Sequence, residues 1–414
     1  MRILHIPHAY APVVGGAELL CKRVGEELAA LGHHVRVVTA DVGSVDGYYE
    51  FGVPPVRQGS PFINGVEVVR IPYGGLLYEP IGRWASRVLP RYVAARVSAR
   101  LLRFIRNRFA ARLEREILAY RPDVVMTLPH LVVNVAAVLR IRKTVPFPLV
   151  VVPLIHEHQS SFSPGALQDL LRTADATVAL TEREATLLKA DYGVPADSVH
   201  NTGVGMDLPE YRRTPARADT VVFLGRKDPA KGIPALLKAM QSVWKHRPEA
   251  SLVLAGARAP GTLAVDRMLG ELPASQRASV RSLDDISERE KMDLLSSACC
   301  LVLPSRIESF GLVILEAWAA GIPVVTYDLP VFRCTVDDGV NGLLVDPGSE
   351  SALPDAILRL LGDRVLADRF GAAGRQKLER EYRWKLVAKR FLGAYEYAVA
   401  KHARSRYRGL AAEH

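Results

Sequence analysis

Cysteine is scarce in this sequence, with 4 residues in a chain of 414. None of them lies in a C-x-x-C pair, and no cluster of cysteine and histidine has the spacing of a zinc site. A disulfide framework is therefore excluded, and we expect no bound metal and reduced, buried thiols in a reducing compartment. The four are Cys21, Cys299, Cys300 and Cys334.

Long apolar runs are missing as well. No stretch reaches the roughly 18 consecutive apolar residues of a membrane-spanning helix. The first residues, Met1–Pro7, lack the long apolar segment of a secretory signal and are typical of a strand, so we expect a cytoplasmic protein. Hydrophobic residues make up 49% of the chain and charged residues 24%, which excludes a disordered, collagen-like or coiled-coil protein. The length predicts two domains.

Acidic residues are nearly absent from one basic segment, residues 83–121. It carries eleven arginines, no lysine and two glutamates, and so holds almost all of the net charge of +10. From about Tyr92 onward it is predicted to be a helix on which Arg96, Arg100 and Arg103 share one face. That face is either solvated or meets anionic phospholipid; nucleic acid is least favoured, because no nucleic-acid fold signature is present. We expect an anionic membrane surface as a partner and no nucleic acid.

Both halves of the chain alternate short apolar runs with helical patterns. Runs that are apolar throughout are typical of strands in a parallel sheet covered on both faces. We therefore expect an α/β fold of two open units in tandem, 1–205 and 206–387, with a polar linker at 203–219. The predicted strands are 2–7, 35–39, 124–128, 149–154 and 176–180 in the first unit, and 221–224, 251–255, 300–303, 324–326 and 343–345 in the second.

Two loops with glycines follow predicted strands. Gly15 and Gly16 precede a helix, where a glycine backbone can approach a ligand and the helix N-terminus attracts anions. A tight turn without a ligand is the alternative, and the spacing is not that of a dinucleotide fingerprint. In the second half, Arg226 and Lys231 follow a strand at the place where ligands bind in open α/β sheets. These cations predict a phosphate site, with a basic surface turn as the alternative.

The most specific pattern lies in residues 304–323. Glu308 follows a predicted strand, and Glu316 stands eight residues later, within a helix that we expect to start near Phe310. Carboxylates accept hydrogen bonds from sugar hydroxyls, and the backbone N–H groups of Phe310 and Gly311 would be available at the helix start. Taken alone, Glu308 could merely complement the helix dipole.

In this order and at these separations, the motifs resemble those of the retaining family 4 glycosyltransferases, which have the GT-B fold. The resemblance runs from about residue 1 to 390, with a poor fit over 43–121. Its motifs are specific to the family but not to one substrate. The matching segments are Gly15–Glu18, Gly32–Thr39, Gly225–Gly232, Glu308–Glu316 and Asn341–Val345.

The resemblance implies a role for each motif of the second domain. Arg226 and Lys231 would hold the donor diphosphate and stabilise it as it leaves, so that neither a metal ion nor a cofactor is expected. Glu316 would bind the donor ribose and Glu308 the transferred sugar. The backbone of Phe310–Gly311 would face that sugar as well.

The resemblance also implies roles for the first domain. The Gly15–Gly16 loop would close on the diphosphate, and His156 would lie near the reacting sugar. His158 is an alternative to it, and a solvated loop histidine is another. This domain would supply most acceptor contacts, and a last helix, 388–414, would return to it.

By the same resemblance, the chain is an enzyme that transfers a hexosyl group from a nucleotide-diphosphate sugar with retention. The acceptor would be a lipid-linked saccharide or a polysaccharide precursor at the inner face of the cytoplasmic membrane. Two alternatives stay open. One is a nucleotide-sugar epimerase on the same fold, which is not expected to carry both the G-R-x4-K-G and E-x7-E motifs. The other is a non-enzymatic, nucleotide-responsive membrane-surface protein.

Three places depart from the family pattern. Ser282 and Asp284 stand where the family often has an aromatic residue and a glycine near the nucleotide base, which leaves the base open. The segment Leu329–Cys334 replaces a common glycine pair and glutamate. Ser309 stands in the place of a glycine, a change that bears on sugar preference.

Overall fold

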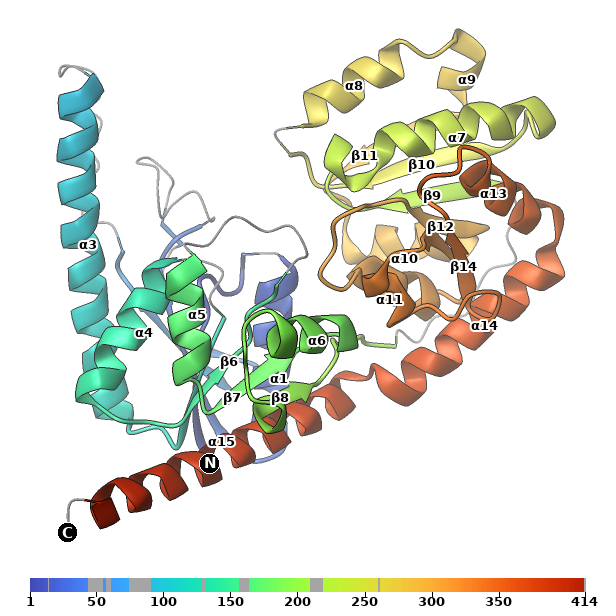
Figure 1. Ribbon diagram of the computed structural model, residues 1–414. Coiled ribbons are helices and arrows are strands. Elements are labelled where there is room, and N and C mark those ends of the chain that lie inside the picture. Colours follow the sequence, from blue (N-terminus) through green and yellow to red (C-terminus); the bar gives the residue numbers. More distant parts are fainter. Residues whose placement is uncertain are drawn as a thin grey trace.

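The computed structural model contains two α/β halves and a long C-terminal helix that leads back from the second half to the first (Figure 1). It describes residues 1–13, 15–43, 55–56, 61–73, 91–128, 132–155, 164–208, 219–259 and 261–412. Only the backbone is described for 91–103, 105, 132–135, 164, 166 and 406–412.

The first half is built on an eight-stranded sheet in the order β3-β4-β2-β1-β5-β6-β7-β8. Its pairings are parallel except for the antiparallel β3–β4 pair at one edge. The strands are β1 (Arg2–Ile6), β2 (His34–Ala40), β3 (Phe62–Ile63), β4 (Val66–Ile71), β5 (Val124–Thr127), β6 (Leu149–Val151), β7 (Ala176–Ala179) and β8 (Val199–Asn201). The helices are α1 (Gly16–Ala30), α3 (Arg91–Tyr120), α4 (Val132–Thr144), α5 (Pro164–Thr173), α6 (Glu182–Ala190) and η2 (Ala196–Ser198).

The second half is built on a six-stranded parallel sheet in the order β11-β10-β9-β12-β13-β14. The strands are β9 (Thr220–Leu224), β10 (Ser251–Gly256), β11 (Val280–Asp284), β12 (Cys300–Leu303), β13 (Val324–Tyr327) and β14 (Gly342–Val345). The helices are η3 (Pro229–Lys231), α7 (Ile233–His246), α8 (Thr262–Gly270), α9 (Ala274–Ala278), α10 (Glu288–Ser297), α11 (Leu312–Ala319), α12 (Pro330–Arg333), α13 (Ala352–Gly362), α14 (Arg364–Glu381) and α15 (Trp384–Ala412).

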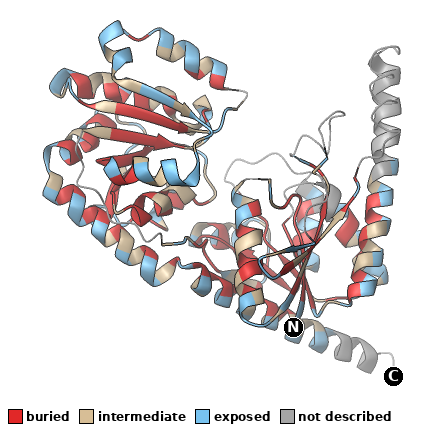
Figure 2. Cartoon of the chain, turned by 180° about the vertical axis from the view of Figure 1, so that it is seen from behind, coloured by how far each residue is buried: buried red, intermediate tan, exposed pale blue. Residues whose placement is uncertain are grey.

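The central strands are buried along their whole length, as β5 and β12 illustrate. Helices cover both faces of each sheet, so both sets of alternating side chains along a strand reach an apolar core (Figure 2). This burial explains why these strands are unbroken apolar runs in the sequence. Polar functional side chains are therefore expected at the ends of the strands and in the loops that follow them.

The chain passes between the halves at two adjacent segments. Met206 of the first crossing donates its backbone N–H to the carbonyl of Tyr382 in the second, at 2.6 Å. Arg390 donates to the carbonyl of Thr202 at 3.0 Å, and so joins the start of α15 to the same crossing. These bonds join the two crossings, and we call the two segments together the hinge.

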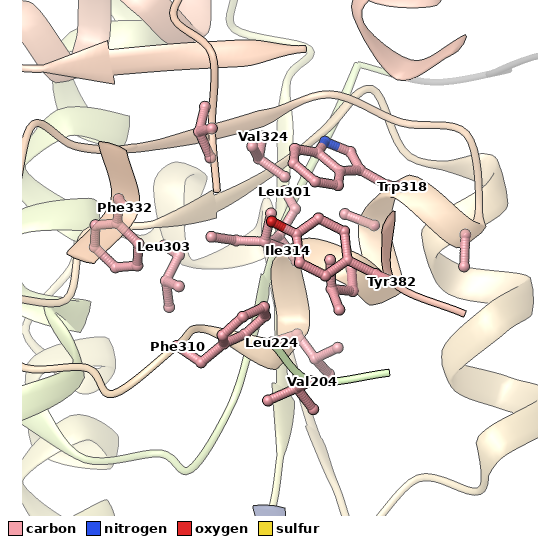
Figure 3. Close-up of a cluster of buried hydrophobic side chains, with 14 of the residues drawn as sticks. Val204, Leu224, Leu301, Leu303, Phe310, Ile314, Trp318, Val324, Phe332 and Tyr382 are labelled. Atoms are coloured by element: carbon pink, nitrogen blue, oxygen red, sulfur yellow. The ribbon is translucent and has the colours of Figure 1, made fainter. Parts of the chain in front are cut away.

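An apolar cluster surrounds this hinge. Figure 3 shows Val204 of the first crossing beside Leu224, Phe310 and Tyr382, which belong to the second half and its return segment. The rings of Phe310 and Tyr382 meet edge to face, with centroids 5.8 Å apart. The cores of the two halves are therefore continuous at this point.

The returning helix α15 packs against α1 and β7 of the first half. The hydroxyl of Tyr395 lies 2.9 Å from Nε2 of the buried His5, on β1. Burial lowers the pKa of His5 to about 3, so the ring is neutral at ordinary pH. Of the described helices, none is both long and apolar enough to cross a bilayer.

Candidate active site

The loop Gly225–Gly232, which we call the phosphate loop, follows β9, and Glu308 follows β12. The two strands are neighbours in the sheet, so the loop and the glutamate lie close together. Gly232 has a φ of +86°, and a Cβ at this position would collide with the carbonyl of Pro304. Glycine therefore allows the two loops to approach each other closely. As a result, Nζ of Lys231 lies 2.7 Å from Oε1 of Glu308. Both side chains are mostly buried, with 22% and 15% of their surface exposed.

Arg226 lies in the same loop, just beyond β9, and is exposed. Its side chain forms no ion pair within the part of the chain that the structure describes. The neighbouring Lys227 and Lys231, by contrast, each contact a carboxylate. Of the three cations of this loop, Arg226 is therefore the exposed one, and within the described chain it has no carboxylate partner.

Glu316 lies in α11 and points to a lysine that has no part in any predicted motif. Its Oε1 is 2.6 Å from Nζ of Lys291, on α10. Burial raises the pKa of Glu316, and the ammonium of Lys291 opposes that rise. Burial disfavours the charge of Lys291 in turn, but the carboxylates of Glu316 and Glu288 outweigh it and raise the pKa of the lysine.

The start of α11 differs from the prediction. The helix begins at Leu312 rather than near Phe310, because Gly311 adopts a left-handed conformation with φ +84°. Phe310 is 3% exposed, and its ring is directed into the hinge cluster. The first backbone N–H groups of α11 have no partner within the helix and are suited to an anion or a polar ligand.

The Gly15–Gly16 loop reaches this helix start from the opposite half. A Cβ on Gly16 would lie 3.3 Å from Cδ1 of Leu312, so the glycine backbone packs closely against the first side chain of α11. Oε1 of Glu18, in the first turn of α1, lies 2.7 Å from Nε2 of His8. The structure thus brings the predicted glycine loop and the predicted donor helix together.

A second group that the sequence analysis missed surrounds Lys227, which is fully buried. Its Nζ donates to Oγ of Ser282 at 2.8 Å and pairs with the carboxylate of Asp284. These are two of the positions that depart from the family pattern. One buried cation thus contacts both of these residues and links the end of β11 to the phosphate loop.

Several predicted residues lie outside what the structure describes. They are His156 and the alternative His158, together with the side chains of Arg96, Arg100 and Arg103, for which only the helical backbone of α3 is described. Among the described residues, no group of three or more histidine, cysteine, aspartate or glutamate side chains is arranged to hold a metal ion.

A pocket of about 250 Å³ lies at the hinge, behind Phe310. Thr181 and Asn201 line it from the first half, and Cys334 and Tyr382 from the second. Because both halves form its walls, its shape depends on how they are placed relative to each other.

Comparison with known families assigns both halves. The model described as Glycosyl transferase 4-like domain matches residues 15–205, and the model described as Glycosyl transferases group 1 matches residues 210–377. Together they extend over every strand except β1 and over the predicted motifs.

Curated relatives agree with this assignment. The chain is 34% identical to the phosphatidyl-myo-inositol mannosyltransferase of Mycobacterium leprae over 206 residues, which are 49% of this chain and 52% of that protein. The chain thus spans about half the length of this mannosyltransferase. It is 27% identical to the D-inositol 3-phosphate glycosyltransferase of Nocardia farcinica, over 93% of this chain and 85% of that protein.

Solved structures share the fold. Sucrose-phosphate synthase from Thermosynechococcus elongatus superposes with a TM-score of 0.76 at 23% identity, over 96% of this chain and 99% of the other. HepE from Anabaena, solved in complex with UDP and glucose, has a TM-score of 0.70 at 18% identity, over 96% and 99% of the two chains. The predicted GT-B arrangement of two Rossmann-like units is therefore confirmed, and the chain belongs to the group 1 glycosyltransferases of the family 4 type.

Proposed function

We propose that this glycosyltransferase moves a hexosyl group from a nucleotide-diphosphate sugar to a cell-envelope acceptor, with retention and without a metal ion or cofactor. The contact between Lys231 and Glu308 carries the proposal. It puts a cation suited to phosphate next to a carboxylate suited to sugar hydroxyls, at the ends of β9 and β12. HepE, which shares the fold, was solved with UDP and glucose, and this supports a nucleotide-sugar donor.

The donor diphosphate would lie between the phosphate loop and the start of α11. Arg226 has its guanidinium available, and the first N–H groups of α11 point out of the helix end. Gly16 lies on the opposite side of the same helix start, close to Leu312. A ligand in this position would contact both halves at once.

Binding of the diphosphate would change the partner of Lys231. Phosphate oxygens would replace Glu308 at the ammonium, and the freed carboxylate could then accept hydrogen bonds from the hydroxyls of the transferred sugar. Diphosphate and sugar would in this way be bound in a coupled step.

In the reaction, the bond between the anomeric carbon and the diphosphate oxygen breaks, and the acceptor hydroxyl bonds to that carbon. Arg226 and Lys231 would stabilise the charge that develops on the leaving diphosphate, the role that a divalent ion has in other transferases. The proton of the acceptor hydroxyl would pass to the departing diphosphate, so that no side chain needs to act as a covalent nucleophile. His156 is proposed to lie beside the reacting sugar.

The acceptor is proposed to be lipid-linked, or a polysaccharide precursor, presented at the inner face of the cytoplasmic membrane. One curated relative is a phosphatidyl-myo-inositol mannosyltransferase, whose name includes a membrane lipid. On this chain, α3 stands at the outer edge of the first half (Figure 1). Phe104 and Leu118 are each 50% exposed on it, and Arg108 and Arg115 are exposed on the same helix face. Apolar side chains mixed with arginine on one face are suited to an anionic lipid surface.

The function is tested by turnover. The purified chain is incubated with UDP- and GDP-linked hexoses, with and without lipid-linked saccharides, and release of the nucleoside diphosphate is measured. We expect release that depends on the acceptor, and a product whose anomeric configuration, read by NMR, is that of the donor. An inverted product would contradict retention, and an epimerised nucleotide sugar without transfer would favour the epimerase alternative. Activity lost with a chelator would contradict metal independence.

A further inference from the structure

Lys291 occupies an unfavourable position for a cation. It lies in the first turns of α10, whose start is fixed by a capping box between Ser287 and Glu290. The N-terminal end of a helix disfavours positive charge through the helix dipole. Its side chain is nevertheless only 13% exposed, so the ammonium is turned into the protein rather than into solvent.

The carboxylate of Glu316 compensates the buried positive charge of Lys291. Nζ of Lys291 lies 2.6 Å from Oε1 of Glu316, whose side chain is 16% exposed. Glu288 is the other charged group that faces the pair, and it lies 2.7 Å from the ammonium. On the far side of α11, Arg375 of α14 bonds to the carbonyl of Ala319, near the other end of that helix, and not to the carboxylate.

A buried carboxylate without this ammonium would tend to be protonated. Burial already raises the pKa of Glu316 while Lys291 is in place, and Lys291 is the main group that opposes the rise. The ionised form offers acceptors only and can receive two ribose hydroxyls, whereas the protonated form also carries a donor. Lys291 therefore opposes the protonation of Glu316 and contacts one of its two carboxylate oxygens.

We infer that Lys291 is a positioning residue of the donor site, which holds Glu316 ionised and aimed at the donor ribose without touching the donor itself. The inference rests on the proposed role of Glu316. A structural ion pair between α10 and α11 is the competing explanation, and the two differ in what they predict for ligands with and without a ribose.

The test compares Lys291→Met, Lys291→Arg and a matched control, Lys238→Met. Lys238 also pairs with a glutamate, Glu350, but on the surface of α7. Affinities for UDP, GDP and inorganic pyrophosphate are measured by calorimetry, and unfolding temperatures are recorded for every variant. Pyrophosphate tests the phosphate contacts alone, because it has no ribose.

We expect Lys291→Met to weaken binding of the preferred nucleoside diphosphate about tenfold to a hundredfold, the range for a charged hydrogen bond. Pyrophosphate affinity should be unchanged, Lys291→Arg should restore most of the loss, and Lys238→Met should behave as wild type. In a Glu316→Gln background, Lys291→Met should cause no further loss, because the two residues act as one unit.

The pH dependence gives a separate measurement. In Lys291→Met, the loss of nucleoside diphosphate affinity on acidification should begin at a higher pH than in wild type, since burial raises the pKa of Glu316 and the ammonium that opposes this rise is gone.

Three results would overturn the inference. Equal losses for pyrophosphate and nucleoside diphosphate would make Lys291 a direct phosphate ligand. A lowered unfolding temperature with unchanged nucleoside diphosphate affinity would leave only a structural ion pair. A loss in Lys291→Met with none in Glu316→Gln would refute the role of Glu316 itself. Failure of the wild type to bind either nucleotide would instead refute the proposed function.

Discussion

At the scale of single residues, Arg226 is distinguished from its neighbours by its exposure and by the lack of an ion pair within the described chain. Its replacement with alanine should weaken binding of UDP or GDP by roughly 1.5–3 kcal/mol, because a charged hydrogen bond to phosphate is lost. The unfolding temperature should not change. Calorimetry and thermal unfolding test both statements, with Lys238→Ala as the control. Unchanged affinity would remove Arg226 from the diphosphate site.

Glu308 should behave differently, because it contacts Lys231 and, in the proposed site, would compete with the donor diphosphate for that ammonium. Glu308→Gln should keep or improve the affinity for a free nucleoside diphosphate, since Lys231 no longer has an anionic partner to leave. Turnover should fall, because the amide cannot replace a carboxylate that accepts from the sugar hydroxyls. Steady-state kinetics together with calorimetry separate the two effects. A variant with full turnover would show that Glu308 is only part of a helix start.

Glu184 makes the stability depend on pH. Its carboxylate accepts the backbone N–H groups of Leu180 and Ile155, each at 2.8 Å, and so ties the end of β7 to the segment after β6. Burial raises its pKa from 4.5 to about 7. The pKa of Glu184 is higher in the folded than in the unfolded chain. Its contribution to the free energy of unfolding is therefore complete below about pH 4.5 and is lost as the pH rises through about 7. Urea unfolding should give wild type a larger advantage over Glu184→Gln at about pH 5 than at about pH 8.

The sequence predicts the charged residues of the site better than their partners. Arg226, Lys231 and Glu308 could be singled out because motifs contain them, and the structure places Lys231 against Glu308. Lys291 and Lys227 could not, since their partners lie 25 and 55 residues away and only the fold brings them close. The prediction for His156 stays a prediction.

At the scale of elements, α3 carries a prediction about membranes. The basic segment should bind vesicles of anionic phospholipid, bind neutral vesicles weakly, and be released as salt rises, since surface attraction is about 1 kcal/mol per basic residue near the headgroups. Replacing Arg96, Arg100 and Arg103 with glutamine should abolish most of this binding and leave UDP or GDP affinity unchanged. Sedimentation with vesicles measures it.

A triple variant of equal charge provides the control for that experiment. Arg277, Arg289 and Arg369 are exposed in the second half, and their replacement with glutamine should leave vesicle binding intact. Equal sedimentation of the wild type with anionic and neutral vesicles, or none with either, would leave α3 as a solvated helix face. Binding to RNA with a steep salt dependence would point to nucleic acid instead.

The ten predicted strands are all observed, because a strand buried on both faces must be apolar at every position. Four strands were missed, the edge strands β3, β8 and β11 and the strand β4, which lies next to the edge and is only half-buried. They are short or polar, as the burial of β11 shows, and their identity comes from pairing with a neighbour. The start of α11 was placed two residues too early, because the conformation of Gly311 cannot be read from its spacing.

At the scale of the whole molecule, close packing at the hinge leaves no room for a side chain at Gly205. A Cβ on Gly205 would collide with the indole of Trp384, at the start of α15. Gly205→Ala should lower the free energy of unfolding by roughly 1–3 kcal/mol through overpacking. Gly393→Ala is the matched control, because its Cβ would meet nothing within 4 Å in the middle of α15. It should raise stability by roughly 0.5–1 kcal/mol. Chemical unfolding measures both, and equal shifts would contradict a tight hinge.

The return of α15 has a consequence for biosynthesis. Phe391, Tyr395 and Ala398 of this helix are fully buried, and α15 packs on α1 and β7, so the first half acquires part of its core from a helix made long after its sheet. The ribosome therefore delivers the whole of the second half before the first half can close. Domains generally fold as units, beginning with the one that is synthesised first. In this chain the second half can complete its fold first, and the half that emerges first has to wait for the helix that completes it.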